Sequence, residues 1–267
     1  MSNYISLSYL PSRFVPYKEK FKISLRPINF EEAENISLIK SKPLEIINLL
    51  NENNVVKVEN MDFYDLTYDD WRFIELTLAN LSYPSIKFNI NGGECPDCKD
   101  HPEHIKLNIG GKEKDIEIKP ELKLVLIPSE VAFEELEDEV STPIMVNLSI
   151  GNFKYDFYRL KHFKILTEND NISNEIKKYD ILTNQTDKYS FEDIAVLRYL
   201  NDFLNHGPKS EFELKCPQCK KLYKIVSAWE VADFLPFRRS TDDIRFKIRF
   251  GKGASSTGRI NKEIGIS

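Results

Sequence analysis

The sequence predicts an α+β fold in which helices and short antiparallel strands are organised around a zinc-ribbon-like site of four cysteines. Three observations support this. Apolar residues recur at steps of three and four in some segments, and they alternate with polar residues in others. All four cysteines of the 267-residue chain fall in two Cys-Pro-x-Cys motifs. We expect a single body at residues 21–237, with extended arms at 1–20 and 238–267.

Composition supports a globular protein. Hydrophobic residues make up 41% of the chain and aromatic residues 12%, which is enough for a substantial core. No apolar run reaches the roughly 18 residues of a membrane-spanning helix, and the first residues are interrupted by prolines. We therefore expect no signal peptide, no membrane contact and a cytoplasmic origin.

The first third of the body reads as a strand followed by helices. Alternation over residues 21–25 predicts a half-buried strand, and two helices are expected at 31–40 and 43–50, the second with proline in its first turn. Thr67, with Asp70 three residues later, resembles a capping box and predicts the start of a longer helix. Its apolar face carries the residues Trp71, Ile74, Leu78 and Leu81.

The remaining elements alternate between strands and helices. The segments 86–90 and 105–109 predict a hairpin around the first cysteine motif, and 122–127 predicts a further strand. The acidic stretch 129–140 is expected to be helical with a solvated face. Further elements are expected as a hairpin at 144–158, a boundary or loop in the polar stretch 167–174, a helix from Ser190 to His206-Gly207, and strands around 212–214 and 222–225.

The cysteine motifs predict a structural metal site. Cys95 and Cys98 form one motif, Cys216 and Cys219 form the other, and 117 residues separate the two. A turn with this spacing between two strands directs two thiolates at one ion, and two such turns supply the four sulfur ligands that structural zinc prefers. Such a site has no open position for water, so its expected effect is on stability, on the order of 10 kcal/mol.

Two other interpretations of the cysteines stay open. His101 and His104 follow the first motif and could complete a local site with Cys95 and Cys98, although Pro102 between them makes that geometry awkward. A redox role would require a motif that opens a helix, whereas strands are predicted on both sides of each motif.

The C-terminal arm differs in charge from the body. Residues 238–267 carry eight Lys or Arg against three Asp or Glu, a net charge of +5, which leaves −10 for residues 1–237. Within the arm, apolar and basic residues alternate, which predicts a strand that adds to a partner subunit or folds back on its own domain. The candidate partner-binding residues are Ile244, Arg245, Phe246, Lys247, Ile248, Arg249 and Phe250.

Motifs typical of enzymes are missing from the sequence. It contains ten glycines, no phosphate-binding glycine-rich loop, no nucleophile elbow and no His-Glu-x-x-His motif. His206, at a predicted helix end, is expected to interact with the helix dipole. We therefore expect a protein that is not an enzyme.

Several short motifs, taken in order, resemble the baseplate protein family of T-even-type contractile-tail bacteriophages. The resemblance covers roughly residues 11–237. The motifs that carry it are Pro11-Ser12-Arg13-Phe14-Val15-Pro16-Tyr17, Ile23-Ser24-Leu25-Arg26-Pro27, Leu66-Thr67-x-x-Asp70, the two Cys-Pro-x-Cys pairs, Leu204-Asn205-His206-Gly207 and Asp233-Phe234-Leu235-Pro236-Phe237. The chain departs from the family pattern at the end of the helix after Thr67, where Ala79-Asn80-Leu81-Ser82-Tyr83-Pro84 stands.

This resemblance implies a structural or assembly component of the tail baseplate hub. Its expected partners are other tail or hub proteins, with homo-oligomerisation left open, and its expected location is the virion or the host cytoplasm during assembly. The alternative is a zinc-ribbon accessory protein that binds nucleic acid through Lys99, Lys220, Lys221, Tyr223 and Lys224. The acidic body opposes this alternative, because most affinity for nucleic acid comes from cations that neutralise phosphates.

Overall fold

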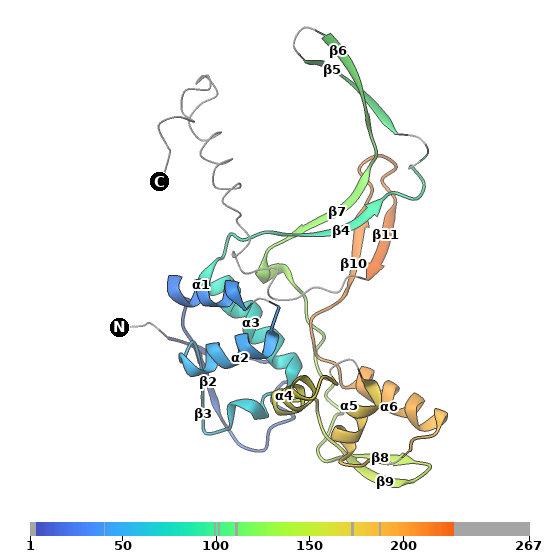
Figure 1. The fold of residues 1–267 in the computed structure, drawn as a ribbon. Helices are drawn as coiled ribbons and strands as arrows, with labels where there is room; N and C mark the ends of the chain where they lie inside the picture. The colour runs from blue at the N-terminus through green and yellow to red at the C-terminus, as the bar shows by residue number, and fades with distance from the viewer. Residues whose placement is uncertain are drawn as a thin grey trace. The chain divides into compact units, whose positions relative to one another are not determined.

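The computed structural model describes residues 4–39, 41–98, 100, 102–109, 112–171, 174–186 and 188–226. Over these residues the protein is a mixed α+β structure with short antiparallel sheets, as predicted (Figure 1). The described α-helices are α1 (Phe30–Leu38), α2 (Pro43–Glu52), α3 (Tyr68–Ser82), α4 (Leu160–Glu168), α5 (Glu175–Thr183) and α6 (Phe191–Phe203). Short 3-10 turns lie at Phe63–Asp65 and Pro128–Glu130. No helix in the described residues is long and apolar enough to span a membrane.

The strands form small antiparallel sheets. One sheet has three strands in the order β1-β2-β3, and the others are the pairs β4-β7, β5-β6, β8-β9 and β10-β11. The bounds of the strands are β1 (Ile5–Leu7), β2 (Lys22–Leu25), β3 (Val56–Glu59), β4 (Phe88–Glu94), β5 (Glu103–Ile109), β6 (Lys112–Ile118), β7 (Glu121–Leu126), β8 (Ile144–Leu148), β9 (Gly151–Tyr155), β10 (Glu211–Lys215) and β11 (Leu222–Val226).

Local signals in the sequence explain most helix starts. Pro43 occupies the first turn of α2, and the side chain of Ser190 caps α6 by accepting the amide of Asp193. Thr67 caps α3 in the same way, accepting the amide of Asp70 at 3.2 Å. Trp71, Ile74 and Leu78 of α3 are buried and Leu81 is half-buried, which confirms the predicted face.

A buried hydrogen-bond network joins three segments that lie far apart in the sequence. Asp70 accepts hydrogen bonds from the amide of Ser12 at 3.1 Å and from the hydroxyl of Tyr17 at 2.6 Å. The Tyr17 hydroxyl in turn accepts the amide of Thr67 at 3.0 Å. On the other side, Thr67 Oγ1 lies 2.9 Å from Nε2 of His206, just after α6. The N-terminal segment, the start of α3 and the end of α6 are thereby held together.

The predicted acidic helix at 129–140 is wrong. Beyond the 3-10 turn the chain runs without helix, and its amides bond to distant segments: Glu134 to the carbonyl of Gly207 at 2.9 Å, and Leu136 to that of Pro11 at 3.0 Å. Leu136 is buried, so this segment gains more from bridging than it would from a local helix with a highly charged surface.

The predicted pairing around the first cysteine motif is also wrong. β4 pairs with β7, while β5 pairs with β6 in a separate hairpin (Figure 1). β4 runs on to Glu94 because two glycines permit an irregularity in the ladder after Asn91. Gly93 has a φ of +77°, and a Cβ on Gly92 would lie 3.1 Å from Cβ of Leu122. Other side chains there would be strained or crowded.

The predicted N-terminal arm, 1–20, is extended only in part. β1 pairs with β2, but residues 11–16 form successive turns, with φ of +53° at Arg13 and +65° at Phe14. Leu10 is fully buried, and the turns place Ser12 and Tyr17 in the network described above. The tightly bonded turns replace the extended chain expected between the two prolines.

Candidate metal centre

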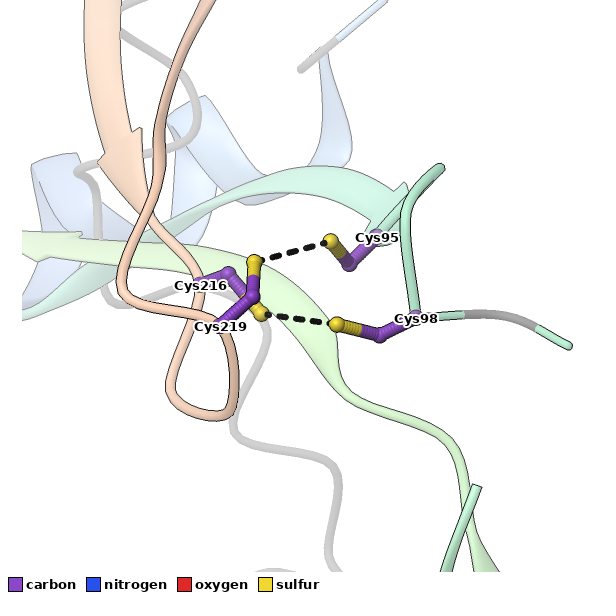
Figure 2. A group of neighbouring side chains, drawn as sticks. All are labelled: Cys95, Cys98, Cys216 and Cys219. Carbon is purple, nitrogen blue, oxygen red and sulfur yellow. Dashed lines mark hydrogen bonds between the residues drawn. The ribbon is translucent and has the colours of Figure 1, made fainter. Parts of the chain in front are cut away.

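The four cysteines converge on one point. Cys95 directly follows β4 and Cys216 directly follows β10, while Cys98 and Cys219 lie in the turns that come next. Figure 2 shows the two turns facing each other across the cluster. Their Sγ atoms all lie within 4.8 Å of one another, with 3.8 Å between Cys95 and Cys219 and 3.9 Å between Cys98 and Cys216. The motifs therefore meet, as predicted.

Backbone hydrogen bonds shape each turn. The amide of Cys98 donates to the carbonyl of Cys95 at 3.2 Å, and in the second turn the amide of Lys220 donates to the carbonyl of Cys216 at 3.1 Å. Lys220 has a φ of +64°, which closes the turn. The amide of Cys95 also donates to the carbonyl of Pro120 at 2.9 Å, which ties the first turn to the start of β7. Thiol positions are thus set by backbone geometry.

The distances suit four-sulfur coordination. A tetrahedral zinc ion with Zn–S bonds of about 2.3 Å requires sulfur atoms about 3.8 Å apart. The two cross-motif distances lie within 0.1 Å of that value. Cys95, Cys98 and Cys216 are buried and Cys219 is half-buried, with the apolar residues Leu122 and Leu214 packed beside them. The cluster is a possible metal site whose donor set is suitable for zinc.

The environment shifts the pKa values of Cys219 and Cys98 in opposite directions. A hydrogen bond from the amide of Lys221 lowers the pKa of Cys219 to about 6, against an opposing effect of burial. Burial and the neighbouring thiols raise the pKa of Cys98 to about 12. Four uncompensated thiolates cannot share this space, so binding of a cation must release protons from the cluster.

Two contacts at the cluster were not anticipated from the sequence. The hydroxyl of Tyr223 lies 3.2 Å from Cys95 Sγ and 3.7 Å from Cys219 Sγ, and the ammonium of Lys221 forms an ion pair with Asp97 across the two turns. In the nucleic-acid alternative, Tyr223 and Lys221 belong to the binding patch. Their separation from the cysteines, four residues and two, could have suggested contact once β11 was known to run back along β10.

The local histidine alternative receives no support from His104. This residue lies on β5, where its Nδ1 is 3.2 Å from Asp115 of β6, and it is absent from the cluster. His101 lies outside the described residues. A redox motif at a helix start is not supported either, because each motif follows a strand and forms a turn.

The remaining predicted site residues separate into two groups. His206 is buried and bonds to the carbonyl of Leu204 through Nδ1 at 2.8 Å and to Thr67 through Nε2, so it acts as a packing and hydrogen-bonding residue between segments. The candidate partner-binding residues 244–250 lie outside the described residues, as does the whole C-terminal arm.

Comparison with known proteins adds nothing to these observations. The chain has no match among models of protein families, curated proteins or solved structures.

Proposed function

We propose that the protein is a non-enzymatic structural or assembly component of a contractile-tail phage baseplate hub, which binds other tail proteins and carries a structural zinc. It would act in the virion or in the host cytoplasm during assembly. The zinc part rests on the geometry of the four cysteines, and the baseplate part on the ordered resemblance of short motifs.

Zinc is the best candidate for the cluster. Four thiolate ligands in tetrahedral arrangement favour zinc or an iron centre, and a closed four-sulfur site with backbone-shaped turns is typical of structural zinc. All four positions are taken by protein sulfur, which leaves none for water or substrate. The metal would therefore stabilise the contact between β4-β7 and β10-β11 and would take no part in catalysis.

One observation supports the baseplate part more than any other. Three of the motifs that resemble the family, which contain Ser12 and Tyr17, Thr67 and Asp70, and His206, meet in the buried network. A chance similarity would have no reason to select residues that contact one another across 53 to 139 positions of sequence. Their shared role is to hold the body together.

Exposed apolar side chains support a role in binding proteins. On α6, Phe191 is 80% exposed and Tyr199 is 71% exposed, and the Tyr199 ring stacks on that of Phe203. The β5-β6 hairpin has no third strand among the described residues, and its Ile105 is also exposed. Two-stranded sheets are marginally stable alone, so a partner that covers this hairpin would stabilise it. The alternating arm 244–250 is a further candidate surface.

The nucleic-acid alternative is weakened by the contacts of three of its candidate residues, while Lys99 lies outside the described residues. Lys221 is paired with Asp97, the ammonium of Lys220 contacts the carbonyl of Pro217, and the hydroxyl of Tyr223 is directed at sulfur. Salt-dependent binding of DNA or RNA by the purified protein would favour that alternative, whereas no binding at moderate ionic strength would favour the structural role.

Two experiments test the proposal. Metal analysis should find one zinc per chain, lost in both Cys98→Ser and Cys216→Ser variants; retention in either would contradict a shared site. Affinity purification of the tagged full-length protein from infected cells, followed by mass spectrometry, should recover named tail proteins without nucleic acid. Recovery of replication or transcription proteins with nucleic acid would overturn the baseplate role.

A further inference from the structure

Tyr223 occupies a distinct position beside the cysteine cluster. It lies on β11, four residues after Cys219, and is partly buried. Its hydroxyl oxygen is 3.2 Å from Sγ of Cys95 and 3.7 Å from Sγ of Cys219, and these two sulfur atoms are 3.8 Å apart. Cys95 belongs to the first motif and Cys219 to the second. A single hydroxyl therefore bridges the two halves of the cluster.

Solvent access is uneven around the four cysteines. Cys95, Cys98 and Cys216 are buried, and Cys219 is the ligand with partial exposure. Water, protons or a competing chelator would therefore reach the sulfur atoms first at Cys219. The Tyr223 hydroxyl lies 3.7 Å from this partly exposed sulfur, so loss of the hydroxyl would change the side from which a chelator reaches the metal.

The direction of the hydrogen bond follows from the chemistry of a bound thiolate. A metal-bound cysteine has no proton and can only accept, so the hydroxyl of Tyr223 must donate. Hydrogen bonds from outside the ligand set orient the ligands and tune a metal site, commonly by 10- to 100-fold in affinity.

We infer that Tyr223 is a positioning residue of the metal centre, which donates to Cys95, holds Cys95 against Cys219 and slows metal release through the Cys219 side. This inference rests on the proposed zinc. The nearby ion pair between Asp97 and Lys221 is a weaker candidate for the same role, because the Lys221 side chain is 65% exposed and such pairs are screened by water and salt.

Zinc release from the full-length protein tests the inference. Tyr223→Phe removes only the hydroxyl, and Tyr199→Phe, on the exposed face of α6, is the matched control. With a chromogenic chelator in excess, we expect zinc transfer from Tyr223→Phe to be on the order of 10-fold faster than from the wild type, with the control unchanged. A Tyr223→Phe protein that purifies without zinc, while the control keeps it, is the extreme form of the expected result.

A spectroscopic measurement separates positioning from a general effect on folding. In cobalt(II)-substituted protein, loss of a hydrogen bond to Cys95 should shift the sulfur-to-cobalt charge-transfer band of Tyr223→Phe and leave that of Tyr199→Phe unchanged. Equal release rates together with equal bands would overturn the role of Tyr223 but leave the zinc centre intact. A wild-type protein that contains no zinc and binds no cobalt would instead refute the proposed function itself.

Discussion

Two regions of this protein join distant parts of the chain, and they do so by different chemistry. The cysteine cluster connects Cys98 to Cys216, while the buried network connects Thr67 to His206. The cysteine cluster is surrounded by few apolar side chains and requires a cation to offset the charge of its thiolates. The buried network consists of directed hydrogen bonds next to the large buried side chains of α3. We therefore expect one contact to depend on metal and the other to be independent of it.

The largest expected effect comes from removing two ligands at once. In Cys98→Ser/Cys216→Ser the amides of β4, β7, β10 and β11 should lose most of their protection from hydrogen exchange, because a structural zinc contributes on the order of 10 kcal/mol. The amides of α3 and α6 should remain protected. Exchange measured by mass spectrometry gives both results together, and equal loss in all elements would show that the two contacts are not separable.

The converse change should leave the metal in place. Asp70→Asn replaces a carboxylate whose two oxygens accept from Ser12 and Tyr17 by an amide with one acceptor oxygen. We expect a loss of about 2–3 kcal/mol in the free energy of unfolding of the helical part, measured by urea denaturation. Zinc content should be unchanged, and Asp202→Asn, on the exposed side of α6, should behave as wild type. Loss of zinc in Asp70→Asn would show that the cysteine cluster depends on the buried network.

A smaller effect is expected in the pH dependence of folding stability. Burial lowers the pKa of His162 to about 4, from an ordinary value of 6.5. Between these two pKa values the unfolded chain binds more protons than the folded chain. The contribution of the buried, neutral His162 to folding stability is therefore fully present above pH 6.5 and is lost as pH falls towards 4. His162→Gln should reduce the loss of stability between pH 7 and pH 5 by about 2 kcal/mol, measured by urea denaturation. Since acid also weakens thiolate–metal binding in both proteins, the difference between them isolates His162.

The two regions also differ in how far the sequence predicts them. The cysteine motifs repeat a rare residue at fixed spacing, so their meeting point could be predicted although 117 residues lie between them. Thr67 could be assigned as a helix cap, but nothing local indicates that its hydroxyl faces His206 or that Asp70 binds Ser12. Single polar residues that meet in three dimensions leave no periodic signal.

The secondary structure also divides into elements with a local sequence signal and segments that depend on distant contacts. The starts of α2, α3 and α6 follow from proline and capping residues, whereas α6 ends at Phe203, before the predicted end at His206-Gly207. By contrast, residues 131–140 have a charged composition favourable to a helix, yet their amides bond to Pro11 and Gly207, which are remote in sequence. Neither α4 nor α5 is predicted. In α4, Leu160, Phe163 and Leu166 recur at steps of three, so a local signal for this helix is present in the sequence. In α5 only a few apolar residues recur at helical spacing. Tertiary contacts decide the conformation of residues 131–140.

The ligands of the bound metal decide whether the two cysteine motifs form one closed zinc site. X-ray absorption at the zinc edge of the purified full-length protein should show four sulfur neighbours at about 2.3 Å and no nitrogen or oxygen neighbour. That result would establish a closed site formed by both cysteine motifs. A coordination shell of two sulfur atoms with nitrogen or oxygen, or a protein without zinc, would rule out a closed zinc site formed by both motifs.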